Sequence, residues 1–202
     1  MITTGYATDI VDVTNGTKCS ALATFPDVGL YGAVGANIAG TLVVCGGYSY
    51  ETSGVSEKCY RFTNNEWEEF ASMKEGRKEA AGVKYGQTLH VFGGKSNSIL
   101  SSTEIINVDG GVSDGPKMPT FIYLHAITAI SDTVSILSGG YGGYTFSKSP
   151  KTWYYNHETK VFSSGPNLLE ARISLGSATN VDRVTKARIP VVTGGYKGFY
   201  NV

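Results

Sequence analysis

The sequence has no charge imbalance, few cysteines and no long apolar run, and each shortage removes a class of protein. Its 17 Lys plus Arg match its 17 Asp plus Glu, so no bulk field attracts nucleic acid or an anionic membrane. Its three cysteines are too few for a disulfide scaffold and lack the spacing of a metal site. No run approaches the ~18 apolar residues of a membrane-spanning helix. The start of the chain lacks a signal-peptide pattern. We therefore expect neither a nucleic-acid nor a membrane partner.

Glycine and tyrosine, by contrast, are abundant. The chain has 26 Gly and 13 Tyr but only 6 Pro, a composition typical of many short strands joined by tight turns. Hydrophobic residues make up 41% and charged residues 17%, which places the chain among globular proteins. No stretch has the 3.6-residue periodicity of an amphipathic helix. The composition therefore predicts an all-β fold.

A repeat is marked by glycine pairs that follow short apolar runs. Successive second residues of these pairs are 42, 47, 46 and 55 positions apart. A period of this length with strand-like content is typical of propeller blades rather than helical repeats. The five marks are Thr4-Gly5 (a degraded copy), Gly46-Gly47, Gly93-Gly94, Gly139-Gly140 and Gly194-Gly195.

Each repeat contains four strand-like segments, lettered a to d from the propeller axis outward. In the best-preserved copy, residues 42–94, a glycine-ended apolar run is strand b, and residues 58–62 form strand c. A turn rich in Asn, Asp or Gly then leads to a short outer strand d, and the next strand a follows. A single blade cannot cover both of its faces, so we expect stability to come from stacking of successive blades.

The same copy carries a family resemblance. Gly46-Gly47, Tyr60, Trp67, Met73 and Arg77 together resemble the kelch repeat. The other copies match in part: Tyr155 and Phe162 keep the aromatic pair, Ile106 and Ser113 stand in its place in the third copy, and Arg172 stands where Arg77 does.

The resemblance covers the whole chain and implies a kelch-type β-propeller of four-stranded antiparallel blades. Residues 1–202 would form one propeller segment. Because the chain starts within a strand b and ends within a strand c, we expect an incomplete ring. Its open sheet edges predict a tendency to self-associate.

No constellation of residues predicts catalysis, a cofactor or a metal site. Ser113 fits the G-x-S-x-G pattern by letter, but the nucleophile elbow needs a strand before it and a helix after it. The glycines of residues 139–143 lack the following helix of a phosphate cradle. His90, His125 and His157 occupy unrelated repeat positions, so we expect no shared metal. We therefore predict that the chain is not an enzyme.

Two alternatives stay open. The first is a fragment of a carbohydrate-active or oxidase kelch propeller, and the second is a structural extracellular repeat. Cys45 and Cys59 bear on the compartment, because they lie on adjacent strands b and c and could form a disulfide. A bridge would indicate an extracellular protein and free thiols a cytoplasmic one.

The resemblance implies that partners dock on the face formed by the b-to-c and d-to-a connections. Tyrosine and arginine often anchor interfaces, and both types occur in these connections. We therefore predict a non-enzymatic module that binds a protein or peptide. Its predicted binding residues are Tyr6, Tyr48, Tyr50, Arg77, Lys78, Lys95, Tyr141, Tyr144, Arg172 and Tyr196.

Overall fold

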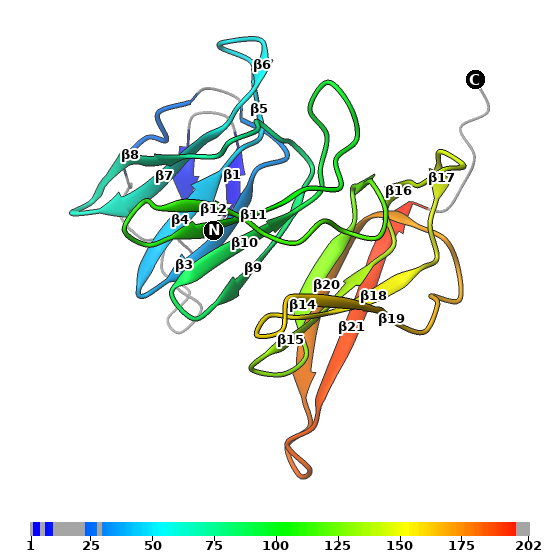
Figure 1. The fold of residues 1–202 in the computed structure, drawn as a ribbon. Helices are drawn as coiled ribbons and strands as arrows, with labels where there is room; N and C mark the ends of the chain where they lie inside the picture. Colours follow the sequence, from blue (N-terminus) through cyan, green and yellow to red (C-terminus); the bar gives the residue numbers. More distant parts are fainter. Residues whose placement is uncertain (1, 5–6, 10–22, 28–29, 197–202) are drawn as a thin grey trace.

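The computed structural model describes residues 2–4, 7–9, 23–27 and 30–196. Every described element is a β-strand, and the sheets follow one another in chain order (Figure 1). The described residues contain no helix with the length and apolarity that a membrane crossing requires. The all-β prediction is therefore confirmed.

In the part of the chain that the structure describes, three four-stranded antiparallel sheets form complete blades, as the repeat pattern predicted. In each sheet the strands lie in chain order, so the innermost strand is a and the outermost is d. The first blade has β3 (Val34–Ile38), β4 (Thr41–Cys45), β7 (Lys58–Thr63) and β8 (Glu66–Ser72). The second has β9 (Ala81–Tyr85), β10 (Thr88–Phe92), β11 (Thr103–Asn107) and β12 (Val112–Asp114). The third has β14 (Ala126–Ala129), β15 (Val134–Ser138), β18 (Thr152–Asn156) and β19 (Val161–Ser164).

Smaller sheets surround these blades. Strands β20 (Ile173–Val181) and β21 (Arg188–Tyr196) form a long hairpin at the positions of a fourth blade's strands a and b. Strands β1 (Ile2–Thr4) and β2 (Ala7–Asp9) pair near the start of the chain. The b-to-c connections hold β5 (Tyr48–Ser49) with β6 (Gly54–Val55), and β16 (Tyr141–Gly142) with β17 (Ser147–Lys148). Strand β13 (Ile122–Tyr123) pairs with β16.

Among the described residues, two hydrophobic clusters lie between successive blades, and another joins Phe25 and Leu30 to Val44 and Tyr60 of the first blade. One cluster joins Val43 and Cys45 of the first blade to Leu89 and Ile106 of the second. Another joins Phe92 of the second blade to residues of the third, including Leu137 and Tyr155. Stacking thus buries apolar side chains of successive blades and stabilises them, whereas Gly35 and Asn37 of β3 stay exposed.

The glycine pairs end strand b because the next blade approaches there. A Cβ on Gly46 would lie 2.4 Å from the carbonyl oxygen of Arg77, and one on Gly93 would lie 2.4 Å from that of Ile122. Both glycines also have positive φ, of 68° and 56°. A side chain would therefore clash with neighbouring backbone as well as strain its own.

The sheet register corrects one sequence alignment. Tyr155 pairs with Phe162 across β18 and β19, and the pair in the same place of the first blade is Phe62 with Trp67. Tyr60 pairs with Val44, two residues before the glycine pair, and Trp153 has the same relation to Leu137. Tyr155 is thus the counterpart of Phe62, because the turn before β19 is longer than the turn before β8.

The strand pair β4–β7 is also joined covalently. A disulfide links Cys45 and Cys59, which face each other directly in the register and are at most 1% exposed. The sequence alone had favoured a disulfide and a pair of free thiols equally.

We expect alkylation of the unfolded, unreduced protein to modify only one of its three cysteines. Reduction before alkylation should expose all three. The bridged residues are 14 positions apart. Loss of the disulfide should therefore lower the free energy of unfolding by about 3 kcal/mol. Mass spectrometry and urea denaturation measure the two effects, and three alkylated thiols without reductant would contradict the bridge.

Candidate functional site

One backbone pairing recurs at the face formed by the b-to-c and d-to-a connections. The residue that follows each glycine pair lies opposite a residue just before, or at the start of, strand a of the same blade. These pairs are Tyr48 with Tyr31, Lys95 with Lys78, Tyr141 with Tyr123, and Tyr196 with Ile173. The repeat therefore places side chains from every blade in corresponding positions on one face.

A left-handed residue follows each position before strand a and links the blades. Gly32, Glu79, Leu124 and Ser174 have φ between 54° and 69°. The N–H of Glu79 donates to the carbonyl of Gly32 at 2.7 Å, and Leu124 and Ser174 donate in turn to Glu79 and Leu124 at 2.9 Å. This ladder fixes the spacing of the connections relative to one another.

Tyrosine and lysine side chains pack together at the first two blades. The rings of Tyr31, Tyr48 and Tyr50 lie 5.4 to 5.6 Å apart, measured between ring centroids. The ammonium of Lys78 donates to the Tyr31 hydroxyl at 2.6 Å and lies 4.8 Å from the ring centre of Tyr48. That hydrogen bond raises the pKa of Lys78, so this lysine stays charged at neutral pH.

The arrangement continues across the next connections. Lys95 lies 5.5 Å from the ring centre of Tyr123, and Tyr123 contacts Tyr141 with ring centroids 5.7 Å apart. Burial raises the pKa of the Tyr123 hydroxyl, so it stays protonated and able to donate a hydrogen bond. We call the set Tyr31, Tyr48, Tyr50, Lys78, Lys95, Tyr123 and Tyr141 the tyrosine–lysine band.

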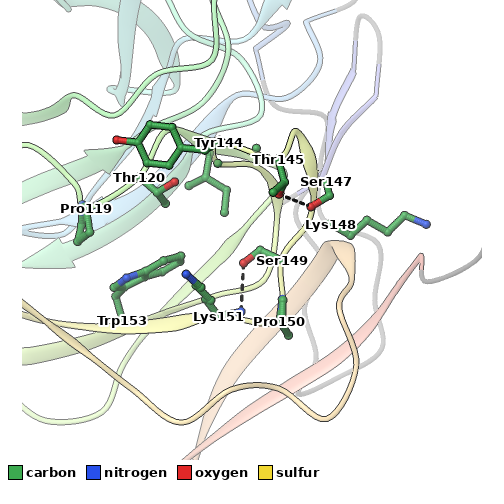
Figure 2. Close-up of a pocket in the computed structure, with 13 residues that line it drawn as sticks. Pro119, Thr120, Tyr144, Thr145, Ser147, Lys148, Ser149, Pro150, Lys151 and Trp153 are labelled. Atoms are coloured by element: carbon green, nitrogen blue, oxygen red, sulfur yellow. Dashed lines mark hydrogen bonds between the residues drawn. The ribbon is translucent and has the colours of Figure 1, made fainter.

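A pocket of about 320 Å³ lies beside the band, at the third blade. Figure 2 shows Tyr144 and Thr120 on one side of this pocket, and Trp153 and Lys151 on the other. Tyr144 is 90% exposed, whereas Trp153 is buried in its wall. Of the described residues, the lining includes the lysines Lys148 and Lys151 and no acidic residue. This charge and shape suit an anionic group attached to an apolar one.

Most of the predicted binding residues reach this face. Tyr48, Tyr50, Lys78, Lys95 and Tyr141 belong to the tyrosine–lysine band, Tyr144 lines the pocket, and Tyr196 lies 4.3 Å from the ammonium of Lys148. Tyr6 lies outside the described residues. Sequence reasoning missed Tyr31 and Tyr123, although both occupy the repeat position of Lys78, one residue before the left-handed turn.

Arg77 is not on this face, which corrects its prediction as a binding residue. Its side chain is 1% exposed and forms an ion pair with buried Glu104 at 2.5 Å. Its guanidinium also donates to the carbonyl oxygens of Gly93 and Ser102, at 2.9 and 3.2 Å. Arg77 therefore holds the glycine-ended strand to strand c and cannot contact a partner. Arg172 is partly exposed, with 27% of its side chain accessible.

Two histidines from unrelated repeat positions, His90 and His157, meet at the contact between the second and third blades. The Nδ1 atoms of His90 and His157 lie 3.2 Å apart, and the other ring nitrogen of His157 bonds the Ser135 hydroxyl at 2.9 Å. Stacking of blades brings these distant positions together. Within the described residues, no three His, Cys, Asp or Glu side chains lie close enough to hold a metal ion.

Comparison with known proteins agrees with the repeat. The chain is 31% identical over 128 residues to Kelch-like protein 33 of Homo sapiens. The match covers 60% of this chain and 24% of that protein, so the chain spans about a quarter of the relative's length. No protein-family model matches the chain.

Proposed function

We propose that this chain, a partial β-propeller of the kelch type, is a non-enzymatic module that binds a protein or peptide through the tyrosine–lysine band. The observation that carries the proposal is the band itself. Residues from corresponding repeat positions gather on one face of successive blades, which is the arrangement of a binding surface rather than of a core.

The chemistry of the band suits a polypeptide partner. Tyrosine offers a large rigid ring and a hydroxyl at low entropic cost, and such residues dominate binding energy at interfaces. The lysines pack on tyrosine rings, so their positions are already ordered before a partner binds. Preorganised side chains lose less entropy on binding. The similarity to a Kelch-like protein supports an interaction role.

We expect the double variant Tyr50→Ala with Lys95→Ala to lose binding while keeping its fold. Tyr50 is 65% exposed, and in the described residues its ring contacts are with other members of the band. Peptides selected from a random phage-displayed library on the wild-type protein provide ligands, and biolayer interferometry measures their affinity. The double variant should bind them at least about tenfold more weakly, with an unchanged melting temperature.

The matched control is Val184→Ala with Lys186→Ala, at the turn between β20 and β21. That turn lies at the opposite end of the molecule from β5, β6 and β17 (Figure 1). The control should bind the selected peptides like the wild type. Equal loss in both variants, or no loss in the Tyr50 and Lys95 variant, would refute the band as the binding surface.

A further inference from the structure

The hairpin β20–β21 has a second sheet edge whose counterpart is covered in every complete blade. Strand β10 of the second blade pairs with β9 on one side and β11 on the other. Strand β21 pairs with β20 on one side, and no described strand pairs with its other side. Strand β20 is anchored on the third blade, where the Ser177 hydroxyl donates to the carbonyl of Ile127 at 2.9 Å.

The first glycine of each pair shows which hydrogen bond the edge of strand b forms with strand c. Its N–H donates to a carbonyl just before or within strand c: Gly46 to Lys58 at 2.9 Å, Gly93 to Ser102 at 3.0 Å and Gly139 to Lys151 at 3.2 Å. Gly194 occupies the same position at the end of β21. The repeat therefore directs its amide toward the edge that no described strand covers.

Arg172 places a positively charged guanidinium at this edge. Its Nη1 donates to the carbonyl of Gly194 at 2.9 Å, as Arg77 donates to Gly93 at the same distance. The Arg77 guanidinium also forms an ion pair with Glu104 of strand β11. The guanidinium of Arg172 instead has Glu170 on its own connection, at 3.0 Å, and stays partly exposed. The two arginines thus differ in their carboxylate partner: that of Arg77 comes from strand c, whereas that of Arg172 comes from the connection before strand a.

We propose that the open edge of β21 binds an antiparallel β-strand that carries a carboxylate for Arg172. The register gives the position of that carboxylate. Glu104 lies opposite Val91, two residues before Gly93, and the corresponding residue of β21 is Val192. The incoming strand therefore places Asp or Glu opposite Val192, and its backbone bonds the amides of Val192 and Gly194.

The occupant is a polypeptide strand rather than a small anion. Edge strands present unpaired backbone groups that another strand can satisfy, and side chains then add specificity. Leu169, which corresponds in position to Lys74 beside Glu104, is fully exposed. This surface is distinct from the tyrosine–lysine band, so the two proposals stand or fall separately.

A labelled nonapeptide with the sequence of residues 101–109, Ser-Ser-Thr-Glu-Ile-Ile-Asn-Val-Asp, tests the proposal. We expect fluorescence anisotropy to show that the labelled peptide binds the protein of residues 1–202. The same peptide with Gln in place of Glu should bind about tenfold more weakly, because a charge-assisted pair is lost. Arg172→Ala should weaken the Glu peptide and leave the Gln peptide unchanged. The control Arg188→Ala, which removes the ion pair with Asp132 at the other end of β21, should change neither.

Hydrogen exchange provides a second readout. Peptide binding should slow exchange of the Val192 and Gly194 amides, because these would bond the added strand. Equal affinity for the Glu and Gln peptides, or unchanged exchange at both amides, would overturn the proposal. So would a dimer in sedimentation equilibrium that the peptide does not dissociate, since a second copy would then occupy the edge.

Discussion

Replacing Arg77 with alanine will lower the free energy of unfolding by about 3–5 kcal/mol. The substitution leaves the Glu104 carboxylate, which is 2% exposed, without its cation. A buried carboxylate that loses its partner keeps its desolvation cost but not its compensation. The substitution also removes the donors to the carbonyls of Gly93 and Ser102. Urea denaturation followed by tryptophan fluorescence measures the change.

The matched control for Arg77 is Arg61. Arg61 also forms an ion pair, with Glu68 at 2.7 Å, but 34% and 48% of the two side chains are exposed. Arg61→Ala should therefore cost less than about 1 kcal/mol. Similar stability of the Arg77→Ala and Arg61→Ala variants would contradict the structural role of Arg77.

A partial rescue separates the buried charge from lost packing. Arg77→Met combined with Glu104→Gln removes both charges but keeps an acceptor for the amides of Lys74 and Glu75, which now donate to Glu104. This double variant should be more stable than Arg77→Ala alone, because no unpaired charge remains in the interior. A double variant no more stable than the single one would show that packing dominates.

Acidification will destabilise the protein well before most carboxylates titrate. His90, His125 and His157 are 3%, 7% and 5% exposed, and burial lowers the pKa of each from 6.5 to about 4. The neighbouring His157 and Lys160 lower the pKa of His90 further. All three side chains are therefore neutral in the folded protein at pH 5, whereas the unfolded chain binds protons there.

The direction of the pH effect follows from these pKa values. Because each folded pKa lies below the unfolded value, protonation favours the unfolded chain. The stabilisation is complete above pH 6.5, declines as the pH falls toward 4, and declines no further below that. At pH 5 the loss is about 2 kcal/mol for each histidine relative to pH 7. Urea denaturation at the two pH values measures it.

His125 offers the cleanest variant, since neither of its ring nitrogens has a hydrogen-bond partner among the described residues. His125→Leu should reduce the stability difference between pH 7 and pH 5 by about 2 kcal/mol, whatever its effect on absolute stability. In the wild-type protein, the His125 ring signals in NMR spectra should not shift between pH 7 and pH 5. A normal titration near pH 6.5 would rule out the buried neutral ring.

The order of the blades could be predicted from sequence because its signals are local. Glycine pairs end strand b where neighbouring backbone leaves no room for a Cβ. Turn residues such as Asn64 and Asn65 adopt positive φ, at 50° and 65°. Positive φ is a requirement of single positions, so it survives in the amino-acid pattern, whereas the clash at Gly46 involves the more distant Arg77. The exact pairing of aromatic residues could not be predicted from sequence, because the length of the turn changes the register by two residues without changing the residue types.

The sequence by itself thus determined the strand order, the four-stranded unit and the connections that carry the tyrosines. Only the tertiary structure decided which polar groups are accessible. Arg77 and Arg172 have the same place in the repeat and the same bond to a glycine carbonyl, yet one is 1% and the other 27% exposed. The difference comes from strand β11, which covers Arg77 and supplies Glu104, whereas no described strand covers Arg172 in the same way. Burial depends on which strands pack against a residue, and that is a property of the assembled sheets rather than of the local sequence.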